Sequence, residues 1–97
     1  MADGEPRAAE SKRGARATGV DLHKAASLLA AGDWQAAHEI VQRDEDSSLA
    51  CWAHGIVHTM EGDEANARYW YRRAKRRFPE QPSLAGELAA LRREIGA

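Results

Sequence analysis

The chain has 97 residues, so it can hold at most one small domain. Its 14 Lys and Arg residues nearly balance its 15 Asp and Glu residues, and a near-neutral protein of this kind lacks the broad basic surface that nucleic-acid binding usually needs. A single cysteine, Cys51, excludes an intramolecular disulfide and a zinc site built from several cysteines.

Residues 1–18 contain no aromatic residue, and their only β-branched residue is Thr18. A segment this polar buries too little apolar surface to offset the entropy lost on ordering, so we expect a disordered N-terminal tail. No apolar segment follows its charges, which argues against a secretory signal peptide, and no run of residues has the length and apolar character of a membrane span. We therefore expect a cytoplasmic protein with one folded domain over residues 19–97 and no membrane contact.

The remaining sequence carries helix signals and almost no strand signals, so the predicted fold class is all-α. The first helix is predicted to begin near Thr18, in the capping pattern TGVD, and to end at Gly32. Asp33 is expected to cap a second helix, which ends in the segment DEDSS. Ser47 or Ser48 is expected to cap a third.

Two further helices follow. Asp63 is expected to cap the fourth, which should continue up to Pro79, because proline disfavours helix in the residue before it. Ser83 opens the last helix, whose apolar stripe is Leu84, Leu88, Leu91 and Ile95.

The chain contains an internal repeat. The segments AGDWQAAHEIVQRD and EGDEANARYWYRRA align without gaps and place Gly32 and Gly62 at equivalent positions, 30 residues apart. Each glycine is expected to end one helix in the left-handed conformation, and the aspartate after it to cap the next helix. The small residues Ala37 and Ala67 follow at the same spacing and allow the helices to pack closely. The sequence thus predicts one helical hairpin used twice.

These residues make the chain similar to the tetratricopeptide repeat (TPR) family, whose helical hairpins carry a Gly-Asp turn followed by small, aromatic, small and proline positions. The second hairpin carries the pattern at Gly55, Gly62, Asp63, Ala67, Tyr71, Ala74 and Pro79. The first carries part of it, at Ala25, Gly32, Asp33, Trp34 and Ala37, and departs from it at Asp44. The string HGIVHTMEGDEANARYWYRRA is also similar to small uncharacterised bacterial helical proteins.

The resemblance implies an α-α superhelix of two antiparallel hairpins, over about residues 19–44 and 48–78, with a C-terminal capping helix over about residues 83–95. Such arrays usually need about three repeats for stability, so the last helix is expected to cover an otherwise exposed apolar face.

A partner-binding face is predicted on the first helix of each hairpin, which lines the concave surface in repeats of this type. Its candidate residues on the third helix are almost wholly apolar: Trp52, Ile56, Thr59 and Met60. Two interpretations stay open. Either the C-terminal helix fills this face, or a partner helix or a second copy of the chain does.

A second candidate site involves histidines. His54 and His58 lie one helical turn apart and Glu61 follows, which is a weak metal-binding pattern. The same histidines with Tyr71 form a candidate small-ligand site. The structural alternative is a buried pair, with His58 hydrogen-bonded to the hydroxyl of Tyr71.

A third candidate is the basic run 68–77, in which Arg72, Arg73, Arg76 and Arg77 are possible contacts for nucleic acid. The helix dipole also favours cations near a helix C-terminus, which explains much of this basicity without a ligand.

Enzyme signatures are missing from the sequence: there is no glycine-rich phosphate loop and no G-x-S-x-G motif, and Cys51 is expected to be a buried apolar side chain. We therefore expect no catalytic residue and no cofactor. The leading hypothesis is a non-enzymatic helical-repeat module that binds another protein or itself. The alternatives are a small-ligand or metal-binding protein using His54 and His58, and a nucleic-acid-binding protein using the basic run.

Overall fold

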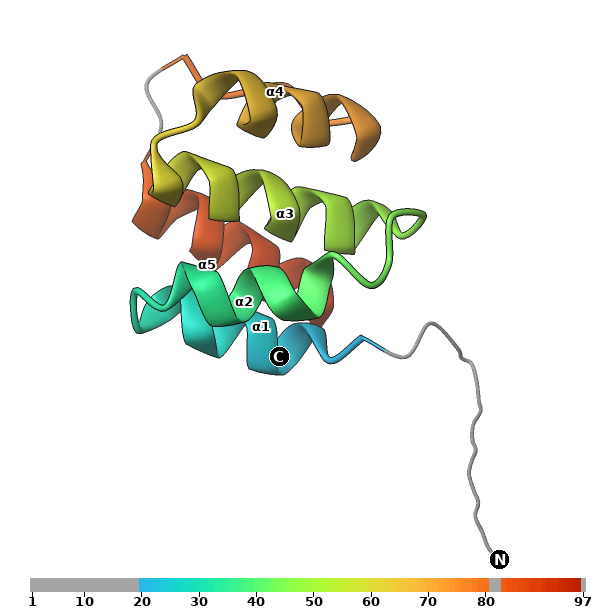
Figure 1. Ribbon diagram of the computed structural model, residues 1–97, viewed down its shortest axis with the longest axis vertical. Helices are drawn as coiled ribbons and strands as arrows, with labels where there is room; N and C mark the ends of the chain where they lie inside the picture. The colour runs from blue at the N-terminus through green and yellow to red at the C-terminus, as the bar shows by residue number, and fades with distance from the viewer. Residues whose placement is uncertain (1–19, 81–82, 97) are drawn as a thin grey trace, which may run out of the picture.

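A computed structural model describes residues 20–80 and 83–96, which form five α-helices and no strand (Figure 1). The predicted all-α class is confirmed for this part of the chain, whereas the predicted tail over residues 1–18 lies outside it. None of these helices is long and apolar enough to cross a membrane. The helices are α1 (Leu22–Ala30), α2 (Trp34–Val41), α3 (Ser48–Glu61), α4 (Glu64–Arg73) and α5 (Leu84–Ile95).

A polar side chain caps the start of each helix. The caps predicted for α2 to α5 are confirmed: Asp33, Ser47, Asp63 and Ser83 each accept a hydrogen bond from a backbone N–H in the first turn. The predicted start of α1 near Thr18 is wrong. Asp21 is extended and its carboxylate accepts the N–H of Lys24 at 3.0 Å, so the helix begins at Leu22.

The two turns of the internal repeat have the same geometry, as predicted. Gly32 and Gly62 have φ angles of 83° and 90°, in the left-handed region that favours glycine. In both turns the N–H of the following aspartate donates to the carbonyl oxygen five residues earlier, at 2.9 Å. This is the long-range bond of a Schellman motif, so the same local sequence ends α1 and α3 in the same way.

The fourth helix ends earlier than predicted. It ends at Arg73, not at Pro79, because Lys75 adopts a left-handed conformation with φ of 61°. The turn is closed by a hydrogen bond from the N–H of Arg76 to the carbonyl of Tyr71 at 2.9 Å. This turn places the Arg76 guanidinium over the indole ring of Trp52, with its central carbon 3.4 Å from the ring centroid. A tertiary contact therefore accompanies the early end of the helix.

Two hairpins and a crossing helix make up the fold. Helices α1 and α2 form one hairpin, α3 and α4 form the other, and α2 packs against α3 (Figure 1). Helix α5 packs against α1 and α3, the first helices of both hairpins, so it lies across the predicted concave face. Its apolar stripe is covered unevenly: Leu91 is fully buried, whereas Leu84 is 40% exposed. The last helix therefore covers this face only in part.

The closest contact of the second hairpin lies at Gly55, as its small size predicted. A Cβ atom on Gly55 would lie 2.5 Å from Cδ1 of Tyr71 and 3.3 Å from the carbonyl oxygen of Ala67. Both neighbours belong to the buried core, and Tyr71 is only 2% exposed. Glycine thus sets the distance between α3 and α4.

We expect Gly55→Ala to lower the free energy of unfolding by about 1–3 kcal/mol, because overpacking outweighs the gain of about 1 kcal/mol in helix propensity. Urea unfolding followed by circular dichroism measures this. In the double variant with Tyr71→Leu, which removes the clashing ring, the loss should be smaller than the sum of the two single losses. An unchanged or raised stability of Gly55→Ala would contradict the contact.

Candidate functional site

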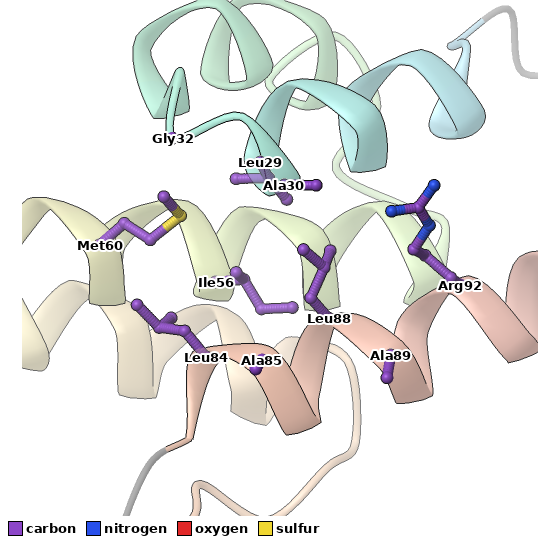
Figure 2. A pocket seen from close by; sticks show the side chains of 10 residues that line it. All are labelled: Leu29, Ala30, Gly32, Ile56, Met60, Leu84, Ala85, Leu88, Ala89 and Arg92. Atoms are coloured by element: carbon purple, nitrogen blue, oxygen red, sulfur yellow. The ribbon is translucent and has the colours of Figure 1, made fainter.

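An apolar groove lies between α1, α3 and α5, with a cavity volume of about 510 Å³ (Figure 2). Its one charged side chain is Arg92, at the end of the groove away from Met60 and Leu84 (Figure 2). The cavity is large enough for a ligand or for anchoring side chains of a partner. The lining residues are Leu29 and Ala30 of α1, Gly32, Ile56 and Met60 of α3, and Leu84, Ala85, Leu88, Ala89 and Arg92 of α5.

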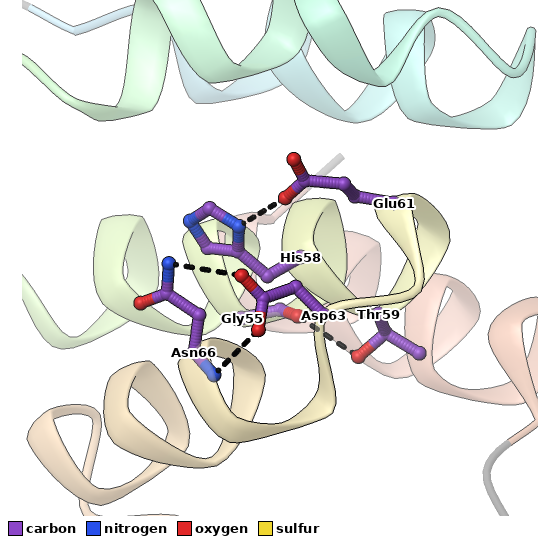
Figure 3. Close-up of polar contacts among 6 residues, drawn as sticks. All are labelled: Gly55, His58, Thr59, Glu61, Asp63 and Asn66. Carbon is purple, nitrogen blue, oxygen red and sulfur yellow. Dashed lines mark hydrogen bonds and ion pairs between the residues drawn. The ribbon is translucent and has the colours of Figure 1, made fainter.

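The structure separates the four predicted partner-binding residues. Ile56 and Met60 line the groove. Thr59 lines a smaller cavity near Phe78, and its hydroxyl donates to the carbonyl of Gly55 at 2.9 Å (Figure 3). Trp52 is fully buried and does not line the groove. Ile56 is itself only 1% exposed, so of these four residues Met60, which is half-buried, is the one that lines the groove with accessible surface.

Trp52 is buried because Glu87 of α5 and Arg76 cover it. Its Nε1–H donates to Oε1 of Glu87 at 3.1 Å, and the hydroxyl of Tyr71 donates to the same oxygen at 2.6 Å. Burial, together with the hydrogen bond to Glu87, raises the pKa of Tyr71 well above its ordinary value. The predicted hydrogen bond between His58 and Tyr71 is therefore wrong, and Tyr71 belongs to the core rather than to a ligand site with the histidines.

Glu87 is a key residue that the sequence analysis missed. A signal was present, because Glu87 lies beside Leu88 and one helical turn from both Leu84 and Leu91, on the buried stripe of α5. An acid within such a stripe indicates a buried hydrogen-bonding role.

The predicted histidines meet a third histidine that the sequence analysis also missed. The rings of His54 and His58 on α3 lie 5.0 Å apart, and the ring of His38 on α2 lies 4.9 Å from His54 and 5.3 Å from His58. The indole of Trp70 stacks on His54 at 3.8 Å with an angle of 8° between the planes. The histidine cluster, His38, His54 and His58, therefore lies where α2 packs against the second hairpin. The spacing of His54 and His58 in the sequence indicated two of its members, whereas no local pattern singled out His38.

Within the cluster, His58 has a hydrogen-bonding partner, whereas Nδ1 of His54 has none among the described residues. Nδ1 of His58 lies 2.7 Å from Oε1 of Glu61 (Figure 3). Nδ1 of His54 is buried and has no hydrogen-bond partner among the residues that the structure describes. Burial, with the nearby His38 and His58 as further causes, lowers the pKa of His54 to about 3. His54 is therefore neutral at pH 7.

The basic run contacts its own chain. Arg73 donates to the carbonyl of Glu45 at 2.7 Å and lies over the ring of Trp70, while Arg76 lies over Trp52. All four candidate arginines, Arg72, Arg73, Arg76 and Arg77, are exposed. Through the contacts of Arg73 and Arg76, two of the four stabilise the fold.

Cys51 is buried as expected, with 1% exposure, and its thiol donates to the carbonyl of Glu45 at 3.3 Å. Burial raises the pKa of the thiol, which disfavours the reactive thiolate.

No protein-family model, curated protein or solved structure matches this chain. The similarity to TPR hairpins is therefore supported only by the residues and turns described above.

We expect Glu87→Ala to lower the free energy of unfolding by about 1–3 kcal/mol, because it leaves a buried indole N–H and a buried hydroxyl without their acceptor. Glu87→Gln keeps an acceptor oxygen and should lose less. Chemical denaturation followed by tryptophan emission measures both. Glu94→Ala, an exposed change on the same helix, is the control and should stay within about 0.5 kcal/mol of wild type. Equal losses at positions 87 and 94 would argue against the role of Glu87.

We expect the free energy of unfolding to fall as the pH is lowered from about 6.5 towards about 3. His54 has a folded-state pKa of about 3 against an ordinary value of 6.5, so the unfolded chain takes up a proton that the folded chain refuses. The loss from this residue is at most roughly 5 kcal/mol.

His54→Phe, which keeps a ring against Trp70, should remove this part of the pH dependence, whereas His23→Gln at an exposed position should not. Denaturation midpoints across this pH range measure it. The same pH slope in wild type and His54→Phe would contradict the assignment.

Proposed function

We propose that this chain is a non-enzymatic, cytoplasmic interaction module of the helical-repeat type, and that its groove binds an amphipathic helix of a protein partner. The observation that carries the proposal is the groove itself. Apolar side chains from three helices line a cavity of about 510 Å³ that α5 leaves open. Open apolar cavities of this volume are typical of binding sites, and helix-in-groove contacts are a common mode of protein recognition.

The shape of the groove favours a helix. Leu84, Leu88 and Arg92 follow one another at intervals of one helical turn, so the groove runs along α5 for about 12 Å. Ala85 and Ala89 are small, which lets the backbone of a partner helix approach closely. A partner segment of about two turns, with apolar residues at helical spacing, fits this length.

The charge of the groove indicates what the partner carries. Arg92 is its one charged residue and is exposed, so it can pair with a carboxylate on the partner. The sequence of residues 1–19 has no leucine, isoleucine, valine or aromatic residue to supply apolar anchors, so we infer that the occupant comes from another molecule.

Two further observations support this proposal over its alternatives. The buried thiol of Cys51 is a poor nucleophile, which favours a non-enzymatic role. Arg73 and Arg76 contact their own chain, which gives part of the basic run a structural role that needs no nucleic acid.

The test is selection from a displayed library of random amphipathic-helix peptides. Wild-type protein should select peptides with apolar residues at positions i, i+3, i+4 and i+7 and an acid at one end. Arg92→Glu should select a base in place of the acid, because the charge at that end of the groove is reversed. Leu84→Asp should weaken the selected peptides at least tenfold. Leu84 is exposed and begins α5, where an acid is favoured by the helix dipole, so this variant should fold normally.

Tyr69→Ser is the matched control, because Tyr69 is a similarly exposed apolar residue on α4 and does not line the groove. It should leave peptide binding unchanged. Peptides that bind Leu84→Asp as well as wild type would exclude the groove as the binding site. Light scattering adds a separate check: a dimer that Leu84→Asp dissociates would show that a second copy, not another protein, fills the groove.

A further inference from the structure

The histidine cluster combines residues from two hairpins. His54 and His58 are one turn apart on α3, and their rings are nearly parallel, with 22° between the planes. Two histidines at this helical spacing present their nitrogens on the same side and can chelate one ion. His38 of α2 approaches both rings edge to face. The ligand atoms of the three residues all lie within 4.8 Å of one another.

The partner of His58 orients its ring as a metal ligand requires. Nδ1 of His58 lies 2.7 Å from the carboxylate of Glu61, which favours a proton on Nδ1 (Figure 3). The lone pair is then on Nε2. A carboxylate behind the far nitrogen of a histidine is the usual arrangement around metal-bound imidazole, where it fixes the tautomer and raises the basicity of the ligand.

His54 contributes a buried imidazole, one nitrogen of which has no hydrogen-bond partner among the described residues. The residue is 97% buried, since its exposure is 3%, and the nitrogen without a partner is Nδ1. A buried nitrogen without a partner is unfavourable, and a bound ion is one partner that satisfies an imidazole.

We propose that His38, His54 and His58 form a binding site for a borderline transition-metal ion such as Zn²⁺, with Glu61 positioning His58. Imidazole nitrogen suits zinc, copper and nickel, and is a poor ligand for magnesium or calcium. In a tetrahedral zinc site the ligand atoms are about 3.3 Å apart, so the rings must close by at most about 1.5 Å. His38 is only half-buried, so it is the least confined of the three rings. Three protein ligands leave a fourth position for water or an external ligand.

The proposal does not depend on the groove, because none of the three histidines lines it. A bound ion joins α2 to α3 and so links the two hairpins. Its binding is therefore expected to raise the melting temperature of the protein.

The test is titration of tag-free protein with Zn²⁺ by calorimetry in a buffer without phosphate. We expect one ion per chain and a higher melting temperature with Zn²⁺, and no change with Mg²⁺. Co²⁺ in place of Zn²⁺ should give the visible absorption bands of a low-coordinate site. His38→Gln should weaken zinc binding at least tenfold, and Glu61→Gln should weaken it about tenfold or more.

His23→Gln is the matched control, since His23 is an exposed histidine of α1 outside the cluster, and it should bind zinc as wild type does. A measurement on wild type complements the variants: zinc should shift the imidazole resonances of the three cluster histidines and leave those of His23 in place. The proposal is overturned if no stoichiometric binding occurs, if His38→Gln binds as tightly as wild type, or if the resonances of His23 move instead.

Discussion

One carboxylate oxygen, Oε1 of Glu87, determines how the last helix lies on the rest of the protein. It accepts hydrogen bonds from Trp52 of α3 and Tyr71 of α4, so a single residue of α5 is held to both helices of the second hairpin. Hydrogen bonds to a charged acceptor are among the stronger ones in proteins. Leu91, one turn after Glu87, is buried, whereas Leu84, one turn before it, is 40% exposed. The groove is the space that this placement of α5 leaves beside α1 and α3.

Helix α3 is the element around which the others pack. It contacts α1, α2, α4 and α5, and every residue from Ala50 to His58 is buried. A helix buried on all sides has no face on which a polar side chain can reach water freely. Its two histidines therefore pack against a third imidazole and an indole ring, and His58 also contacts the carboxylate of Glu61, which is exposed. The histidine cluster is the consequence of placing polar rings in the central helix.

Local signals predicted the parts of the fold that short segments determine. The left-handed turns at Gly32 and Gly62, the caps at Asp33 and Asp63, and the close contact at Gly55 follow from conformational limits of single residues, and all are observed.

What the sequence did not predict depends on residues far apart. Tyr71 donates a hydrogen bond to Glu87 rather than to His58, which is nearer in the sequence. His38 belongs to the other hairpin and joins the cluster through the packing of α2. The helix α4 ends at Arg73 through a left-handed lysine that no sequence rule favours, where the chain turns to place Arg76 on Trp52. The sequence indicated the apolar face on the first helices of the hairpins. Which part of that face stays open as the groove depends on where α5 packs, and the sequence does not determine that position.

The two candidate sites use opposite sides of α3. Ile56 and Met60 line the groove beside α1 and α5. His54 and His58 precede them by two positions each, which places the histidines on the other side of the helix, toward α2 and Trp70 of α4. The hairpin of α1 and α2 contributes to both, through Leu29 to the groove and through His38 to the histidine cluster. If the two proposed occupants bind, an ion at the cluster and a helix in the groove would each act on the packing of this hairpin against α3. By thermodynamic reciprocity, the factor by which a bound ion changes the affinity for the helix equals the factor by which a bound helix changes the affinity for the ion.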